Sequence, residues 1–155
     1  MDLLIWIEGL PPVAALKRSF VAYPLVNATH ILSIGVLITT VALMDLRLLG
    51  FLREFDTKDF VRRLHGFALA GFAGAAATGL AMFTIRASEY VANPAFLLKL
   101  VVILAAGLNM LLLRRQLASS RSAYSNPGAT VRAQAALSLM LWLGVLICGR
   151  FIGFL

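Results

Sequence analysis

Three ionisable side chains in this sequence, His30, Lys99 and Arg150, lie inside three different long apolar runs. An ionisable residue in a segment that crosses a bilayer is expensive to bury and is therefore a candidate for a function. A neutral imidazole ligates haem iron through one ring nitrogen, while a neighbouring polar group holds the other nitrogen. Lysine and arginine pair with anions such as haem propionates. These residue types predict a site for haem b, with His30 as the metal ligand.

The spacing places the three side chains at one depth. An α-helix rises about 1.5 Å per residue, so His30, seven residues into the run 23–44, lies roughly 10 Å from its outer end. Lys99, five residues past Pro94, and Arg150, five residues before the end of the sequence, both lie about 8 Å from the same side. We therefore expect the three side chains to meet near the outer face of a membrane. Two alternatives stay open: both cations snorkel to the interface, or a deprotonated Lys99 is itself a ligand or a proton carrier.

Polar residues continue along the helix that carries His30. Tyr23, Asn27, His30 and Ser33 recur at steps of four, three and three, which places them on one helix face. A polar stripe in a membrane-spanning helix faces the interior of the bundle. Tyr23 and Asn27 are therefore further candidate cofactor contacts. The simpler alternative is a histidine that only makes a hydrogen bond inside the bundle.

The second histidine, His65, lies at a different depth. It follows Arg63 by two residues, which places it about 3 Å inside the opposite, cytoplasmic end of its run. The expected height difference from His30 is nearly 20 Å, which excludes one haem clamped between the two imidazoles. His65 stays a candidate cofactor contact, although an interfacial position beside the neighbouring arginines explains it more simply. Asp45 is interpreted as marking the cytoplasmic end of the first helix.

The composition is that of a membrane protein. Hydrophobic residues make up 61% of the 155 residues, charged residues make up 14%, and the mean hydropathy is +0.90. These values exclude an ordinary soluble globular protein and a disordered chain. The single cysteine, Cys148, excludes a disulfide framework and a cysteine-based metal site. No Walker loop, nucleophile elbow, HExxH or CxxCH motif is present, and no paired methionine spacing supports copper.

Four runs are long and apolar enough to cross a bilayer, at residues 23–44, 64–85, 95–113 and 135–155. They predict an all-α, integral membrane four-helix bundle that forms a single domain over residues 1–155. The residues before the first run contain the helix-breaking pair Pro11-Pro12 and do not resemble a cleaved signal peptide. They predict a short N-terminal segment that lies along the membrane interface.

Lysine and arginine in the connections predict the orientation. The connections after the first and third runs together hold nine, namely Arg47, Arg53, Lys58, Arg62, Arg63, Arg114, Arg115, Arg121 and Arg132. The other side holds three outside the runs, namely Lys17, Arg18 and Arg86. Positively charged connections stay in the cytoplasm, so both termini are expected to be periplasmic, in a bacterial inner membrane. In this setting the net charge of +7 sets orientation and does not indicate a nucleic-acid partner.

Small residues are dense in the second run, with pairs such as Ala70/Gly74 and Ala75/Gly79 four residues apart. Such pairs let two helix backbones approach closely. Close packing is the favoured interpretation, and a slot for a flat cofactor is the alternative. Asn109 in the third run is expected to hydrogen-bond to a neighbouring helix.

Two stretches carry a resemblance to known families. The run from His30-Ile-Leu-Ser-Ile-Gly to Asp45-Leu-Arg-Leu-Leu-Gly50 resembles the first helix of a widespread, mostly uncharacterised bacterial family of small four-helix membrane proteins. Thr78-Gly79, followed by Asn93-Pro94 and Lys99, resembles the pattern of the CopD and HemJ group. HemJ-like proteins contain haem b and oxidise protoporphyrinogen, and CopD-like proteins are tied to copper uptake. The HemJ resemblance implies matching roles for His30 and Lys99, but the sequence lacks HemJ's aromatic helix start and the methionine and histidine richness of copper handling.

Three functions follow as hypotheses. The first is a haem-b-binding inner-membrane protein that transfers electrons between quinone or a partner subunit and an acceptor on the outer side, either as an oxidoreductase or as a redox subunit of one. The second is a non-catalytic membrane subunit that anchors or assembles a larger complex. The third is a transporter of a small anion or a metal, which the absence of an internal repeat makes the weakest.

Overall fold

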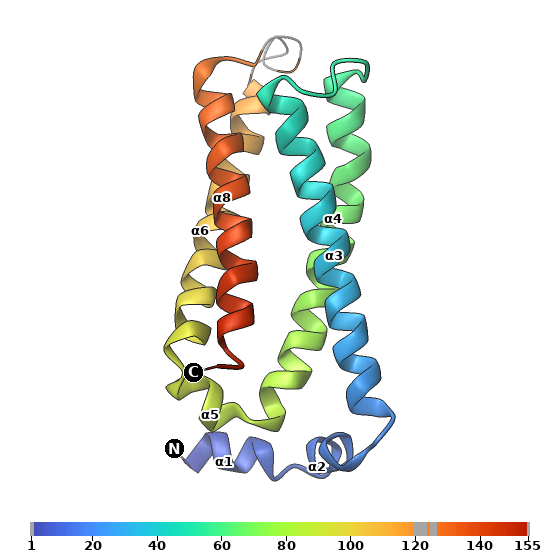
Figure 1. Ribbon diagram of the computed structural model, residues 1–155, viewed down its shortest axis with the longest axis vertical. Helices are drawn as coiled ribbons and strands as arrows, with labels where there is room; N and C mark the ends of the chain where they lie inside the picture. The colour runs from blue at the N-terminus through green and yellow to red at the C-terminus, as the bar shows by residue number, and fades with distance from the viewer. Residues whose placement is uncertain (1, 120–123, 125–126, 155) are drawn as a thin grey trace.

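Four long helices dominate the computed structural model, which describes residues 2–119, 124 and 127–154. They are α3 (Ala22–Leu49), α4 (Thr57–Ile85), α6 (Pro94–Ser119) and α8 (Ala129–Phe151) (Figure 1). All four are long and apolar enough to cross a membrane, and the described residues include no β-strand. The predicted all-helical, four-span architecture is confirmed at this level.

The helices extend beyond the apolar runs that predicted them. α3 continues to Leu49 and ends at Gly50, whose φ of 104° is a left-handed conformation that glycine adopts without strain. α4 begins at Thr57, because the Asp56 side chain accepts a hydrogen bond from the backbone N–H of Asp59 and caps the helix. Asp45 and His65 therefore lie one to two helical turns inside the bundle, and not at helix ends.

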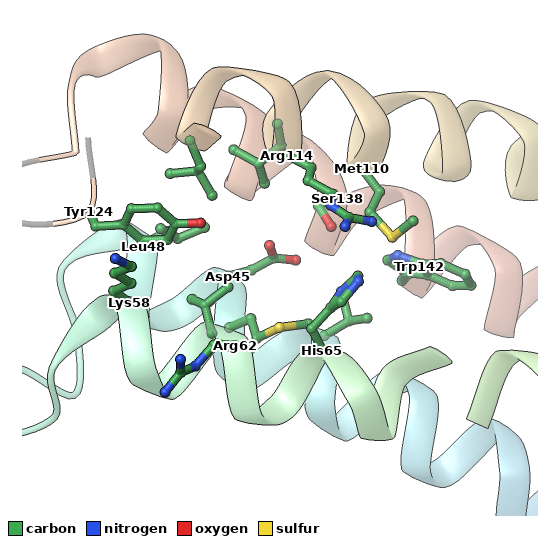
Figure 2. Close-up of a pocket in the computed structure, with 15 residues that line it drawn as sticks. Asp45, Leu48, Lys58, Arg62, His65, Met110, Arg114, Tyr124, Ser138 and Trp142 are labelled. Carbon is green, nitrogen blue, oxygen red and sulfur yellow. The ribbon is translucent and has the colours of Figure 1, made fainter. Parts of the chain in front are cut away.

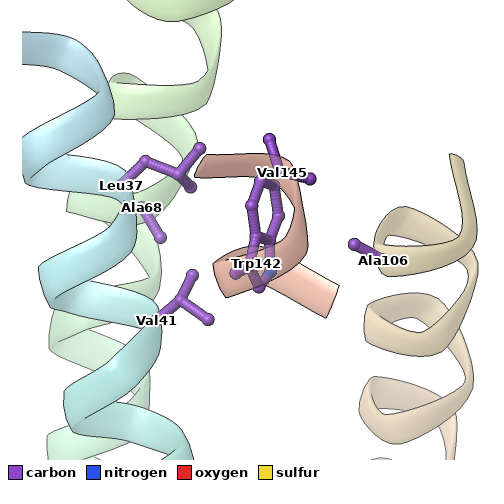
Figure 3. Packing of buried hydrophobic residues seen from close by; sticks show 6 residues of the cluster. All are labelled: Leu37, Val41, Ala68, Ala106, Trp142 and Val145. Atoms are coloured by element: carbon purple, nitrogen blue, oxygen red, sulfur yellow. The ribbon is translucent and has the colours of Figure 1, made fainter. Parts of the chain in front are cut away.

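The long helices form two pairs. α3 packs along α4, α6 packs along α8, and the two pairs meet where α3 contacts α8. In Figure 1 the pairs lie close together at the end with the α3–α4 connection and diverge toward the end with α5 (Ala87–Ala92). Side chains from all four helices fill the contact between the pairs (Figure 3), namely Leu37, Val41, Ala68, Ala106, Trp142 and Val145.

Two short helices, α1 (Asp2–Glu8) and α2 (Pro11–Arg18), lie across the α5 end of the bundle (Figure 1). Pro11 and Pro12 occupy the first turn of α2, so the expected break in the N-terminal segment is confirmed. The Glu8 carboxylate accepts hydrogen bonds from the Ser88 backbone N–H at 2.8 Å and from the Ser88 hydroxyl at 2.7 Å. These bonds attach α1 to the first turn of α5.

The arrangement brings the two basic connections to the same end of the molecule. The α3–α4 connection and the start of α8 lie together at the end opposite α1 and α5 (Figure 1). Arg121, one of the nine basic residues counted above, lies outside the described residues. The grouping of both basic connections at one end is what the positive-inside pattern requires.

Candidate functional site

His30 lies on the face of α3 that packs against α4. Its Nδ1 atom is 2.9 Å from the Thr78 hydroxyl oxygen, and that hydroxyl is 2.6 Å from the Gly74 carbonyl oxygen one turn earlier in α4. A hydroxyl has a single hydrogen, and at 2.6 Å that hydrogen is donated to the carbonyl. The Thr78 oxygen therefore accepts a hydrogen bond from His30 Nδ1–H. A neutral imidazole in this tautomer carries its lone pair on Nε2.

Ser33 shares the face of His30, as the stripe pattern predicts. It lies against Gly74 of α4, because its hydroxyl occupies the space that a Cβ atom at Gly74 would need. Asn27 is half-buried, but Tyr23 is 38% exposed at the start of α3. Burial raises the pKa of Tyr90 in α5, and the nearby Tyr23 phenol raises it further. Tyr23 therefore belongs with the α5 end of the molecule and not with the interior beside His30.

The contact between α3 and α4 is closed by direct packing. A Cβ atom at Gly71 would be 2.8 Å from the Leu37 backbone nitrogen, and one at Gly79 would be 3.1 Å from His30 Cε1. The small residues thus let the two helices touch, which confirms the packing interpretation. The space between α3 and α4 at this level has no room for a flat cofactor.

The two predicted cations occupy different positions. Lys99 is half-buried in α6, and its Nζ atom would be 3.4 Å from a Cβ atom at Gly149 of α8. Arg150 is exposed, and its guanidinium lies 4.5 Å from the centre of the Phe154 ring. Lys99 therefore points into the contact between α6 and α8. Arg150 does not join it there, because the next residue along a helix faces about 100° away.

His65 lies far from His30. His30 contacts Thr78, and thirteen residues of α4 separate Thr78 from His65, which is about 20 Å along the helix. The depth argument against one haem held by both histidines is therefore confirmed. Among the described residues, no group of three or more histidine, cysteine, aspartate or glutamate side chains is arranged to hold a metal ion.

A cavity of about 270 Å³ lies beside His65, near the α3–α4 connection (Figure 2). All four long helices contribute to its lining, including Asp45 from α3, His65 from α4, Arg114 from α6 and Ser138 from α8. Asp45 is only 3% exposed. Its Oδ2 atom and the Nε2 atom of His65 are both buried and have no hydrogen-bond partner. The cavity therefore presents two unpaired polar atoms to whatever occupies it.

The apolar run that ends at Met44 placed Asp45 at a helix end, so this cavity was not predicted from the sequence. A usable signal was present in Gly50, a residue type typical of the position just after a helix. A helix that ends at Gly50 carries Asp45 more than one turn inside, at about the depth of His65 on the next helix. Asn109, in contrast, behaves as expected, since its side-chain amide donates to the Gln134 carbonyl oxygen of α8 at 3.0 Å.

Among the comparisons with known proteins, only the comparison with family models gives a match. No curated protein and no solved structure matches the chain. A family model described as "Family of unknown function (DUF6644)" matches residues 19–155, which covers all four long helices. The match shows no link to the CopD and HemJ group. The chain belongs to the DUF6644 family of proteins of unknown function.

Proposed function

We propose that this chain is an inner-membrane electron-transfer protein that binds haem b through His30. The observation that carries the proposal is the bond from His30 Nδ1–H to the Thr78 hydroxyl. A histidine that ligates a metal typically donates its other ring N–H to an oxygen, which fixes the tautomer and the ring orientation. Packing alone does not require one fixed tautomer, whereas Nε2 needs it to act as a ligand.

The residues present fit one axial histidine. His30 would hold the iron on the side of its ring away from the closed contact with Gly79 of α4, and Lys99 would pair with a propionate. Arg150, exposed beside Phe154, fits a propionate less well than Lys99. When bound, the haem supplies one-electron chemistry. The protein contributes the axial nitrogen, its orientation by Thr78, and a cation in a medium of low dielectric constant.

The proposal includes a direction for the electrons. The basic connections assign the α3–α4 end of the bundle to the cytoplasm and both termini to the periplasm. His30 then lies in the outer half of the bilayer. We propose that a quinol, which is oxidised to quinone with loss of two electrons and two protons, or a partner subunit supplies electrons and that an acceptor outside receives them.

Absorption spectroscopy of the purified chain tests the proposal. The chain is expressed with and without added haem precursor and purified in mild detergent. We expect a Soret band whose reduced-minus-oxidised spectrum is that of haem b. His30→Ala removes the band, whereas His65→Ala, the matched control on the neighbouring helix, retains it.

Two outcomes would overturn the proposal. A chain that shows no Soret band, even after reconstitution with haemin, does not bind haem and would instead favour the membrane-anchor function. A His30→Ala chain that retains an unchanged spectrum would refute the ligand assignment.

A further inference from the structure

The cavity beside His65 holds the strongest unexplained feature of the molecule, which is a pair of buried polar atoms without hydrogen-bond partners. Almost all buried polar groups in proteins have a hydrogen-bond partner, so a buried carboxyl oxygen without one needs an explanation. Here Asp45 Oδ2 and His65 Nε2 both lack a partner and line the same cavity (Figure 2). Two such atoms on neighbouring helices indicate a ligand that completes their hydrogen bonds.

The helix packing around the cavity bears on how a ligand would enter it. Its lining comes from α4 and α6 as well as from α3 and α8. α3 packs against α8 behind it, but α4 and α6 are not among the helix pairs that pack against each other in the described residues. A ligand that enters between α4 and α6 comes from the lipid, which favours a lipophilic molecule.

The charges around the cavity select against a metal cation. Lys58, Arg62 and Arg114 line it together with the single carboxyl of Asp45. Arg62 is paired with Asp59, which does not line the cavity, so Lys58 and Arg114 remain against the single carboxyl and keep the cavity net positive, which repels a metal ion. A phosphate placed beside Asp45 is also unfavourable, because two anionic groups would share a buried space.

The remaining walls are apolar and aromatic. Trp142 lies at the end of the cavity away from Tyr124, with Met110 beside it (Figure 2), and Met44 also contributes to the lining. Tryptophan stacks on flat rings, and methionine adapts to irregular apolar shapes. A flat ring with polar groups at its edge would pack against the apolar walls and hydrogen-bond to the two unpaired atoms.

We propose that this cavity binds the headgroup of a membrane quinone or quinol, with Asp45 and His65 as its hydrogen-bond partners. An ionised Asp45 accepts a hydrogen bond from a quinol hydroxyl, and a protonated Asp45 donates one to a quinone carbonyl. His65 Nε2 pairs with a second oxygen of the ring. A cavity of about 270 Å³ admits such a ring and leaves the isoprenoid tail to pass between α4 and α6 into the lipid. The inference rests on the proposed electron-transfer function and names its inner-side binding site.

Trp142 gives a direct binding test that does not depend on haem. In a Trp6→Phe chain, Trp142 is the sole tryptophan, since the sequence has two. Decylubiquinone is titrated into this chain in detergent, and the quenching of tryptophan fluorescence is recorded. We expect saturable quenching, with an apparent Kd at least tenfold weaker in Asp45→Leu and in His65→Asn. Glu54→Leu, which removes an exposed acidic side chain outside the cavity, leaves the Kd unchanged.

The variants also separate this inference from the proposed function. His30→Asn removes the haem site but leaves the quinone Kd unchanged, so either site can fail without the other. The elution profile of each variant in size-exclusion chromatography is compared with that of the parent chain to check folding. If Asp45→Leu does not fold, the quinone Kd of His65→Asn alone tests the inference. Quenching that rises linearly without saturation, or an apparent Kd that is the same in the Asp45 and His65 variants as in the Trp6→Phe parent, would overturn the inference. Quenching that excess short-chain phosphatidylglycerol abolishes would assign the cavity to a lipid headgroup and overturn it as well.

Discussion

Gly71 of α4 touches the backbone of Leu37 of α3 so closely that a Cβ atom at residue 71 would lie 2.8 Å from the Leu37 nitrogen and 3.0 Å from the Ser33 carbonyl oxygen. Both atoms belong to a helix backbone, which cannot move aside as a flexible side chain does. We expect Gly71→Ala to lower the free energy of unfolding by about 1–3 kcal/mol, the usual cost of overpacking. Denaturant titration in detergent micelles, followed by circular dichroism, measures this change.

Gly66 on the same helix provides the matched control. A Cβ atom there would have no atom within 4 Å, and alanine favours a helix over glycine by about 1 kcal/mol, so Gly66→Ala should leave the unfolding transition unchanged or shift it to slightly higher stability. Equal effects of the two substitutions would contradict the close approach of α3 and α4.

The Thr78 hydroxyl should control the affinity of His30 for haem. Thr78→Val keeps the shape of the side chain but removes the oxygen that accepts the Nδ1–H bond. Loss of such a supporting contact typically lowers metal affinity 10- to 100-fold. Titration of apoprotein with haemin should show this loss. Thr84→Val is the control, because the Thr84 hydroxyl bonds only to the Ala81 carbonyl of its own helix.

The attachment of α1 should weaken at acidic pH. The hydrogen bonds from the backbone N–H and hydroxyl of Ser88, together with the nearby Lys17 charge, lower the pKa of Glu8 below its ordinary value of 4.5. A lowered folded-state pKa means that this stabilisation is fully present above pH 4.5 and is lost as the pH falls through the folded-state pKa. The hydrogen-exchange protection factors of residues 2–8, which are corrected for the intrinsic pH dependence of exchange, should therefore fall on acidification, and only in chains that retain Glu8.

Glu8→Gln separates this effect from general acid unfolding. The amide cannot titrate, so the protection factors of residues 2–8 should be lower than in the parent at neutral pH and should change little as the pH falls. An unchanged acid response in Glu8→Gln would show that another group is responsible.

Cysteine labelling tests the orientation. In a Cys148→Ala background, Glu54→Cys places a thiol in the α3–α4 connection and Glu89→Cys places one in α5. Both parent side chains are exposed. An impermeant maleimide should label residue 89 in intact spheroplasts but residue 54 only after lysis. The reverse pattern would invert the assignment of both ends.

Hydropathy predicted the long helices because each contains a run with almost no charge. Their starts were less predictable, since α4 opens with the polar turn that Asp56 caps and such turns resemble a loop in sequence. Depth was also predictable, because rise per residue is constant. The separation of His30 from His65 followed from this arithmetic alone.

The direction of each side chain around its helix was not predictable in the same way. His30 was expected to have a polar neighbour at its second ring nitrogen, but identifying Thr78 requires the rotation of α4 relative to α3. Arg150 has the expected depth, yet it faces Phe154 and not the interior. Asp45 was missed because the helix continues to Gly50 beyond the end of its apolar run.

The contact of the two helix pairs along α3 and α8 has a consequence for biogenesis. Each pair is a helical hairpin with its own internal packing, so each inserts into the bilayer as a unit before the two dock. In the described part of the chain the two pairs approach each other most closely along α3 and α8, and side chains from all four helices fill the contact. Two polypeptides divided within α5, one per hairpin, should therefore still find each other when they are co-expressed in the same membrane.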